Sequence, residues 1–262
     1  MLEREIEARS RKKRILLMAH AVLGYPGPAP CLEVIGRLAR GEADLLELQI
    51  PCPDPVADGP VIRRANEQAI LAGASPAACL GLVREAAQRF PGRIVVMTYY
   101  STVCGWGVNR FAESAARCGA AGVIVPDLPP EDGAPLLEAL RGNGLAPILI
   151  LTRTDPARRI DRMSTLGGGF LYCVTRAGVT GAATRFDSDV AAPLLRCRRA
   201  STLPLAAGFG VSSRADVAFL EGRVQIAAIG TELIRRLERG GLEAVEAFLL
   251  SLRSPRDAFP PS

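Results

Sequence analysis

The sequence predicts an α/β fold consisting of a single (β/α)8 barrel, because strands and helices alternate along it and the strands are apolar on both faces. Runs rich in Val, Ile and Leu recur about every 20 to 40 residues, with helical periodicity between them. Eight such parallel strands favour a closed barrel, although an open doubly wound sheet fits the same pattern. The predicted strands span residues 15–22, 44–50, 94–99, 121–126, 146–151, 169–175, 203–207 and 225–229.

Helices are predicted between these strands, with one extra helix, residues 1–12, before the first strand. The length of 262 residues matches the roughly 250 residues of one such barrel. We therefore predict one domain over residues 1–262, with a frayed Pro-rich tail from residue 254. The other predicted helices span residues 29–40, 61–72, 76–90, 108–118, 131–143, 156–166, 189–200, 212–221 and 231–252.

Composition disfavours several classes of protein. The net charge is +5, but basic residues are spread out, and the one dense run, residues 11–14, is interpreted as a solvated helix end. Nucleic-acid binding is therefore not expected. The seven cysteines include no C-x-x-C pair, which favours a reducing cytoplasm over a zinc cluster or a disulfide framework. No apolar run approaches the roughly 18 residues of a membrane span, so neither membrane insertion nor export is predicted.

Two scarce residue types limit the chemistry. The only lysines are Lys12 and Lys13, which precede the first strand, so no lysine can form a Schiff base at the end of a later strand. The only histidine is His20, so a zinc site of several imidazoles cannot form. Acid–base chemistry must therefore rest mainly on carboxylates and tyrosines.

The clearest catalytic candidate is Glu47, in a strand otherwise made of Leu, Ile and Gln. A carboxylate at such a position is costly unless it is paired or neutralised, which is typical of a working acid or base facing the barrel mouth. The alternative is a glutamate on the outer face that contacts an arginine. Asp58 follows in a Pro-rich loop, where an ordinary turn or a helix N-cap is an equal alternative.

Glycines at three successive strand ends predict a phosphate site. They lie in residues 178–181, in residues 208–210 and at Gly230, which Thr231 follows. Glycines let backbone N–H groups approach a phosphate closely, and barrels of this kind bind phosphate after strands 7 and 8.

The run E-L-Q-I-P-C-P-D-P-V-A-D-G-P over residues 47–60 resembles a signature of the tryptophan synthase α subunit family, and the similarity extends from about Leu16 to Leu252. Further matching stretches are residues 97–100, 126–131, 169–172, 178–182 and 208–212. The resemblance implies retro-aldol cleavage of indole-3-glycerol phosphate to indole and glyceraldehyde 3-phosphate, without metal or cofactor. It also implies a partner, the β subunit, in a complex of two α and two β subunits.

The resemblance assigns roles to the candidate residues. Glu47 would move protons at indole C3 and the glycerol hydroxyl, and Asp58 would accept a hydrogen bond from the indole N–H. Tyr172 would orient or assist Glu47, with core packing as its alternative role. His20 and Tyr99 would line the substrate pocket.

The remaining assignments concern the phosphate and a loop. Gly181, Gly210, Gly230 and Thr231 would contact the substrate phosphate. Thr180 would lie on a loop that closes over the substrate.

The sequence departs from the family pattern near this site. Gln49 stands where the family usually has glycine, and residues 52–53 (Cys-Pro) replace the usual Phe-Ser in a loop that contacts the β subunit. Residues 101–102 (Ser-Thr) replace Asn-Pro. His20 stands where an apolar or aromatic residue is common, and is interpreted as a hydrogen-bonded structural residue or, alternatively, as a modulator of Glu47 or a contact to an altered substrate.

These departures leave three functional hypotheses. The first is the α subunit of tryptophan synthase. The second is a free-standing lyase that releases indole for another pathway. The third is a catalytically weak subunit that activates a β partner, which the retained candidate residues disfavour.

Overall fold

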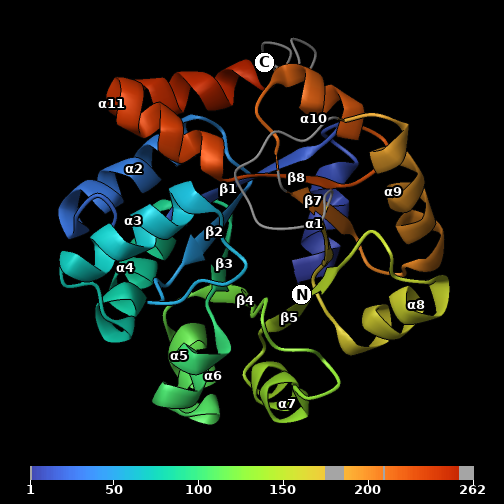
Figure 1. The fold of residues 1–262 in the computed structure, drawn as a ribbon, viewed down its shortest axis with the longest axis horizontal. Helices are drawn as coiled ribbons and strands as arrows, with labels where there is room; N and C mark the ends of the chain where they lie inside the picture. The colour runs from blue at the N-terminus through green and yellow to red at the C-terminus, as the bar shows by residue number, and fades with distance from the viewer. Residues whose placement is uncertain (1, 175–185, 209, 254–262) are drawn as a thin grey trace.

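The computed structural model describes residues 2–174, 186–208 and 210–253. Eight parallel strands close into a barrel in chain order, β1 to β8, with β8 pairing β1 (Figure 1). The predicted (β/α)8 fold is confirmed, and the open doubly wound alternative is wrong. The strands are β1 (Leu16–Val22), β2 (Leu45–Gln49), β3 (Arg93–Met97), β4 (Ala120–Ile124), β5 (Ala146–Leu151), β6 (Leu171–Val174), β7 (Leu205–Gly208) and β8 (Ile226–Ile229).

The helices lie outside the strands, apart from α1, which crosses the barrel in this view (Figure 1). Three of them begin with proline at the first position, Pro28, Pro60 and Pro76, where the missing N–H has no helical partner to lose. The helices are α1 (Leu2–Ser10), α2 (Pro28–Arg40), α3 (Pro60–Leu71), α4 (Pro76–Arg89), α5 (Tyr100–Trp106), α6 (Val108–Arg117), α7 (Ala134–Gly142), α8 (Ala157–Leu166), α9 (Ser188–Ala200), α10 (Arg214–Leu220) and α11 (Thr231–Ser251).

The predicted elements all occur, with ends displaced by a few residues. The main difference is α5, a short helix that the sequence analysis did not predict. Its first backbone N–H, at Tyr100, donates to both carboxylate oxygens of Asp127, at 2.9 and 3.1 Å, so a residue beyond the next strand supports the helix start. The predicted frayed tail from residue 254 lies outside the described residues.

Alternation along each strand separates two apolar regions. In β2, Leu45 belongs to the cluster inside the barrel, whereas Leu46 and Leu48 pack with the surrounding helices. Glu47 and Gln49 share the face of Leu45 and therefore point inward. Leu2 and Ile6 of α1 belong to the interior cluster together with residues at the beginnings of strands, so α1 covers the N-terminal end of the barrel. The opposite, C-terminal end remains for the polar residues.

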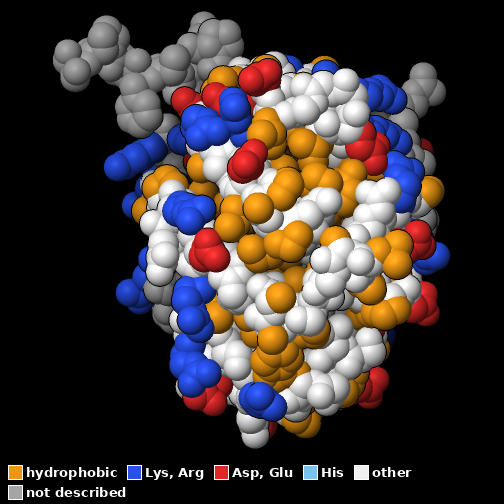
Figure 2. All heavy atoms as spheres, turned by 90° about the vertical axis from the view of Figure 1, so that its left-hand side faces the viewer, with side chains coloured by type: hydrophobic (Ala, Val, Ile, Leu, Met, Phe, Trp, Pro, Cys, Tyr) orange, Lys and Arg blue, Asp and Glu red, His pale blue; other side chains and the backbone are white. Residues whose placement is uncertain are grey.

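The side of the molecule that carries α2, α3 and α4 has a broad band of hydrophobic side chains, with charged side chains around it (Figure 2). Two large hydrophobic residues near this helix group are strongly exposed, Val56 at 50% and Leu71 at 87%. Within the described ranges no single helix has the length and apolarity to cross a membrane, and only α3 and α4 taken together, at 105° to each other, meet those criteria.

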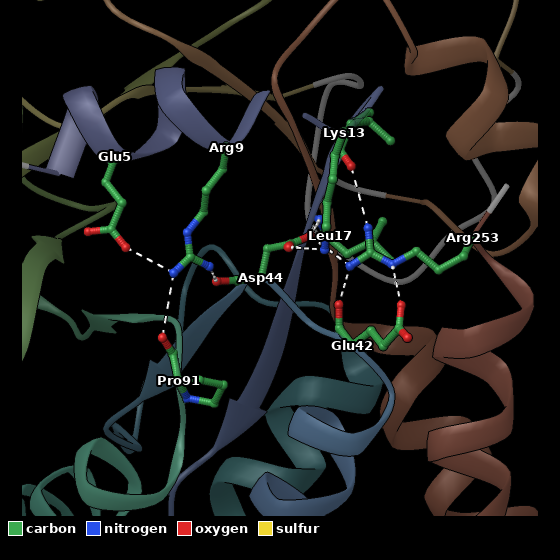
Figure 3. Close-up of polar contacts among 9 residues, drawn as sticks. Glu5, Arg9, Lys13, Leu17, Glu42, Asp44, Pro91 and Arg253 are labelled. Carbon is green, nitrogen blue, oxygen red and sulfur yellow. Dashed lines mark hydrogen bonds and ion pairs between the residues drawn. The ribbon is translucent and has the colours of Figure 1, made fainter. Parts of the chain in front are cut away.

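A buried carboxylate ties the N-terminal end of the barrel together. Asp44, directly before β2, accepts from Lys13 Nζ at 2.6 Å, from Arg253 Nη2 at 2.7 Å and from the Leu17 backbone N–H at 2.9 Å (Figure 3). Arg9 of α1 donates to its carbonyl oxygen at 3.3 Å. Lys13 therefore binds a buried carboxylate, and the interpretation of residues 11–14 as merely a solvated helix end is wrong for Lys13.

Candidate active site

Adjacent strands bring His20 and Glu47 together at the C-terminal half of the barrel. The two residues are partners in the β1–β2 register, and His20 Nδ1 lies 3.3 Å from Glu47 Oε1. Their side chains are 6% and 10% exposed. The structure thus places Glu47 inside the barrel and rules out the alternative position on the outer face. It also gives His20 the hydrogen-bond partner that its structural interpretation required.

The environment of His20 acts on its protonation in two directions. Burial lowers the pKa of the imidazole, but the hydrogen bond to Glu47 and the negative charges of Glu47 and Asp58 outweigh it, so the pKa of His20 is raised. The second ring nitrogen, Nε2, is buried without a hydrogen-bond partner in the described part of the chain. The ring therefore retains hydrogen-bonding capacity beyond its contact with Glu47.

Asp58 lies in the loop between β2 and α3 and is 3% exposed. Its Oδ2 accepts from Gln49 Nε2 at 2.7 Å and from the Tyr99 hydroxyl at 2.9 Å. The N-cap of α3 is Gly59, so Asp58 does not have the alternative role of helix cap. Burial raises the pKa of Asp58, while the Gln49 hydrogen bond, the charge of His20 and the Tyr99 hydrogen bond oppose that shift.

A buried amide network supports the Asp58 loop. Gln49 Nε2 also donates to Asn66 Oδ1 at 3.3 Å, and the Cys52 backbone N–H donates to the same oxygen at 3.0 Å. Both amide side chains are completely buried. From the sequence, Gln49 was only a departure from a family pattern, and Asn66 was not predicted to belong to the site. The one available signal was a glutamine in an otherwise apolar strand.

Tyr99 and Tyr172 approach the carboxylates from other strands. Tyr99, just after β3, also accepts from the Ala57 backbone N–H at 3.2 Å, and burial raises the pKa of its phenol strongly. Tyr172 of β6 is 8% exposed, and burial together with the negative charges of Glu47 and Asp58 raises the pKa of its phenol well above the usual range. The barrel thus brings Glu47, Asp58 and Tyr172 close together.

Tyr172 also explains one glycine of the predicted phosphate segments. A Cβ at residue 208 would collide with the Tyr172 hydroxyl and ring, so glycine there makes room for the phenol. Gly210 has φ +103°, a conformation that favours glycine. The predicted phosphate residue Gly181 and the predicted loop residue Thr180 lie outside the described residues.

The start of α11 has the features of an anion site. Gly230 is its N-cap and provides no side-chain hydrogen bond, and Thr231 is the first helical residue. The first N–H groups of a helix have no helical acceptors and attract anions. A Cβ at Gly230 would lie 3.5 Å from His20 Cβ, so this helix start is next to His20 at the barrel mouth.

Among residues 2–174, 186–208 and 210–253, no group of three or more His, Cys, Asp and Glu side chains is placed to hold a metal ion. The polar side chains at the barrel mouth include two carboxylates, two phenols, an amide and one imidazole.

Comparison with known proteins assigns the family. Residues 6–252 match the family model described as tryptophan synthase alpha chain. The tryptophan synthase alpha chain of Desulforapulum autotrophicum is 45% identical over 96% of this chain and 100% of its own length, and that of Syntrophotalea carbinolica is 44% identical over 97% and 100%.

Solved structures agree with this assignment. A structure of Mycobacterium tuberculosis tryptophan synthase superposes with a TM-score of 0.89 at 30% identity, covering 96% of both chains. The tryptophan synthase subunit alpha of Legionella pneumophila gives 0.88 at 28% identity, again covering 96% of both. On sequence and structure together, this chain belongs to the tryptophan synthase alpha chain family.

Proposed function

We propose that this protein cleaves indole-3-glycerol phosphate by a retro-aldol reaction to indole and glyceraldehyde 3-phosphate, the lyase activity of tryptophan synthase alpha chains. The observation that carries the proposal is the pair of buried carboxylates, Glu47 and Asp58, at the C-terminal mouth of the barrel. Family membership supports the same reaction. We propose that no metal or cofactor takes part.

Glu47 is the proton-transfer residue in this proposal. A proton added at indole C3 gives a cationic indolenine. Loss of the proton from the glycerol hydroxyl then sends the electrons of the breaking carbon–carbon bond into the ring, releasing indole and the aldehyde. One carboxyl group can perform both transfers if it is held rigidly, and the contact of Glu47 Oε1 with His20 Nδ1 fixes one of its oxygens.

Asp58 stabilises the cationic intermediate. A carboxylate that accepts a hydrogen bond from the indole N–H offsets the positive charge which develops on the ring. Gln49 and Tyr99 both donate to Oδ2 of Asp58 and leave Oδ1 out of these two bonds. The indole N–H would bind at Oδ1.

Tyr172 and His20 complete the polar environment of Glu47. Tyr172 stays protonated because its pKa is raised, so it can donate a hydrogen bond toward the carboxylates but is not a base. His20 lies between Glu47 and the start of α11 and lines the substrate pocket with Tyr99.

The substrate phosphate would bind after the last strands. Gly230 and Thr231 supply the uncapped N-terminus of α11, and Gly210 lies two residues beyond the end of β7. Gly181 would contribute from the segment after β6, with Thr180 on the loop that covers the substrate. With the phosphate bound there, the glycerol chain would lie near His20 and the indole near Asp58.

A tryptophan synthase β subunit is the proposed protein partner, and the cytoplasm is the proposed location. The band of hydrophobic side chains over α2–α4 and the exposed Val56 in the Asp58 loop give this side the apolar character of an interaction surface (Figure 2). The seven cysteines form no disulfide, which suits a reducing compartment.

The test is indole release from indole-3-glycerol phosphate by the purified protein, alone and with an added β subunit. Glu47→Gln is the inactive variant, and Glu67→Gln, an exposed position on α3, is its matched control. Slow turnover that rises with the β subunit supports the α-subunit function. Fast turnover alone supports a free-standing lyase, which the substitutions at Gln49, Cys52 and Pro53 leave open, and no turnover in either assay contradicts both.

A further inference from the structure

We propose that Gln49 is a positioning residue that holds the Asp58 carboxylate for the substrate. Asn66 and the Cys52 backbone N–H orient the Gln49 amide so that its nitrogen faces Asp58. The inference rests on the proposed function, because it assigns a task to a residue beside the proposed indole site. Gln49 lies on β2, two residues beyond Glu47 on the same inward face.

Backbone groups fix which atoms of this hydrogen-bond network are donors and which are acceptors. A backbone N–H can only donate, so the Asn66 atom that faces Cys52 N at 3.0 Å must be the amide oxygen. The other end of the same amide agrees, since Asn66 Nδ2 lies 2.9 Å from the Ile62 carbonyl oxygen, which can only accept. Two main-chain groups therefore fix the orientation of Asn66 without any assumption about Gln49.

Asn66 in turn fixes Gln49. The Gln49 atom that faces Asn66 Oδ1 at 3.3 Å must be the nitrogen, because an oxygen there would face an acceptor. The same nitrogen lies 2.7 Å from Asp58 Oδ2. A flipped Gln49 would place its carbonyl oxygen against two acceptors at once, so the amide is held as a donor to Asp58.

The result is a carboxylate with one oxygen fixed and one left to the substrate. Gln49 and the Tyr99 hydroxyl hold Oδ2 from two directions. Because Gln49 comes from β2 and Tyr99 from the end of β3, the Asp58 side chain is fixed relative to the barrel wall and does not depend on its own loop alone. Such positioning matters for a group that must meet a charge developing on the substrate.

The charged and titratable groups around Asp58 come from strands β1, β2 and β6, from the residues after β3, and from α3, where Arg63 Nε donates to the Asp58 carbonyl oxygen at 2.8 Å. His20 of β1 favours its carboxylate form, Glu47 of β2 disfavours it, Tyr99 beyond β3 donates to it, and Tyr172 of β6 interacts with its charge. Among the interactions that lower the pKa of Asp58, the hydrogen bond from Gln49 has the largest effect. Removal of this donor therefore raises the pKa of Asp58 further and moves the carboxylate form to higher pH.

Gln49→Met tests the proposal, since methionine fills a similar volume but cannot donate. Gln68→Met, at an exposed position on α3, is the matched control. In indole-3-glycerol phosphate cleavage we expect kcat of Gln49→Met to fall on the order of tenfold. We expect KM to change little and the acid limb of the pH–rate profile to move to higher pH, because the carboxylate form of Asp58 has lost a donor. A merely structural role would lower the melting temperature without moving the acid limb.

A second readout separates this inference from the proposed function. Carboxyl ¹³C chemical shifts of aspartate-labelled protein, with Asp58→Asn to assign the Asp58 signal, report its titration without any substrate. If the unmodified protein does not cleave the substrate but the Asp58 titration moves upward in Gln49→Met, the proposed function fails and the positioning role stands.

An unchanged Asp58 titration and an unchanged pH–rate profile in folded Gln49→Met would overturn the inference. If Gln49→Met does not fold, Asn66→Leu answers the same question, because without Asn66 the Gln49 amide is free to turn. The expected change is then a smaller upward shift of the same titration, and no shift would again overturn the inference.

Discussion

Strand β2 connects two buried carboxylate sites of opposite character. Asp44 at its N-terminal end is bound by two cations, Lys13 and Arg253, whereas Glu47 and Asp58 near its C-terminal end contact a histidine, an amide and a phenol. Paired cations neutralise a carboxylate and make it an anchor. An amide, a phenol and a histidine that can release its proton orient a carboxylate but leave it able to accept a proton or a substrate hydrogen bond. The kind of partner, more than the degree of burial, distinguishes a carboxylate that stabilises the fold from one that can take part in catalysis.

The largest expected effect is on activity at the mouth. Glu47→Gln removes the proposed proton-transfer group, so kcat for indole release should fall roughly 10² to 10⁴-fold. The unfolding midpoint in urea should change far less than in the Asp44 variant below, because the glutamine still fills the site. A Glu47→Gln protein that retains near-normal kcat would remove Glu47 from the proposed mechanism.

Asp44→Asn should show the reverse pattern. The variant leaves Lys13 and Arg253 without their shared carboxylate, and the loss of one partner from a buried ion pair costs about 3–5 kcal/mol of unfolding free energy. Activity at a temperature where the variant stays folded should match the unmodified protein. Chemical denaturation and indole release, measured on the same preparation, check both halves, and a stable Asp44→Asn variant would undo the comparison.

The two cations that bind Asp44 at the N-terminal end of the barrel should contribute unequally to the free energy of unfolding. Arg253 is 9% exposed and contacts Asp44, the Glu42 backbone and the Ile15 carbonyl, whereas the Lys13 side chain is 25% exposed and, within the described part of the chain, has its ion pair with Asp44. Lys13→Met should cost about 1 kcal/mol, within the range of partly exposed pairs. Arg253→Met should lower the free energy of unfolding by more than Lys13→Met does. Urea denaturation of both variants measures the difference. Equal losses would mean that the additional Arg253 contacts contribute nothing.

The smallest expected effect is a pH dependence at His20. Its folded-state pKa is raised above the ordinary value of about 6.5, so its stabilising contribution is fully present below that pH and is lost as pH rises through the folded-state pKa. The difference in unfolding free energy between the unmodified protein and His20→Phe should shrink as pH rises across this window. A flat difference curve would show that the Glu47 contact does not favour the protonated ring.

The same variant decides between the two interpretations of His20. If His20 modulates Glu47, the pH–rate profile of His20→Phe should differ from that of the unmodified protein. If the profiles coincide, the histidine serves structure alone.

Sequence reasoning found the elements whose signal is local. Apolar runs located every strand, and Glu47 was identified because a carboxylate inside such a run needs a reason. Barrel closure was less accessible, since eight parallel strands favour a barrel but also fit an open sheet, and the choice between them depended on the motifs and the resemblance. The short helix α5 was missed because its start depends on Asp127, which lies beyond the following strand.

Polar partnerships were the hardest to foresee. Lys13 was interpreted as solvated because its partner Asp44 is 31 residues away, and nothing near Lys13 in sequence announces it. The Gln49–Asn66–Asp58 network depends on the orientation of two amides, which residue identity does not specify. The roles assigned to Glu47, Asp58, Tyr172, Gly210, Gly230 and Thr231 remain predictions, and Gly181 and Thr180 lie outside the described residues.

The link between Arg253 and Asp44 joins positions 209 residues apart, beside the β1–β8 pairing that closes the barrel. On the ribosome, Asp44 and the β1 edge therefore emerge long before their last partners exist. A nascent chain that ends before β8 has an unpaired strand edge and a carboxylate that lacks one of its cations, and both features mark a protein as unfinished. A chain truncated before β8 therefore cannot close the barrel, and we expect cellular proteases to degrade it faster than the chain that contains β8.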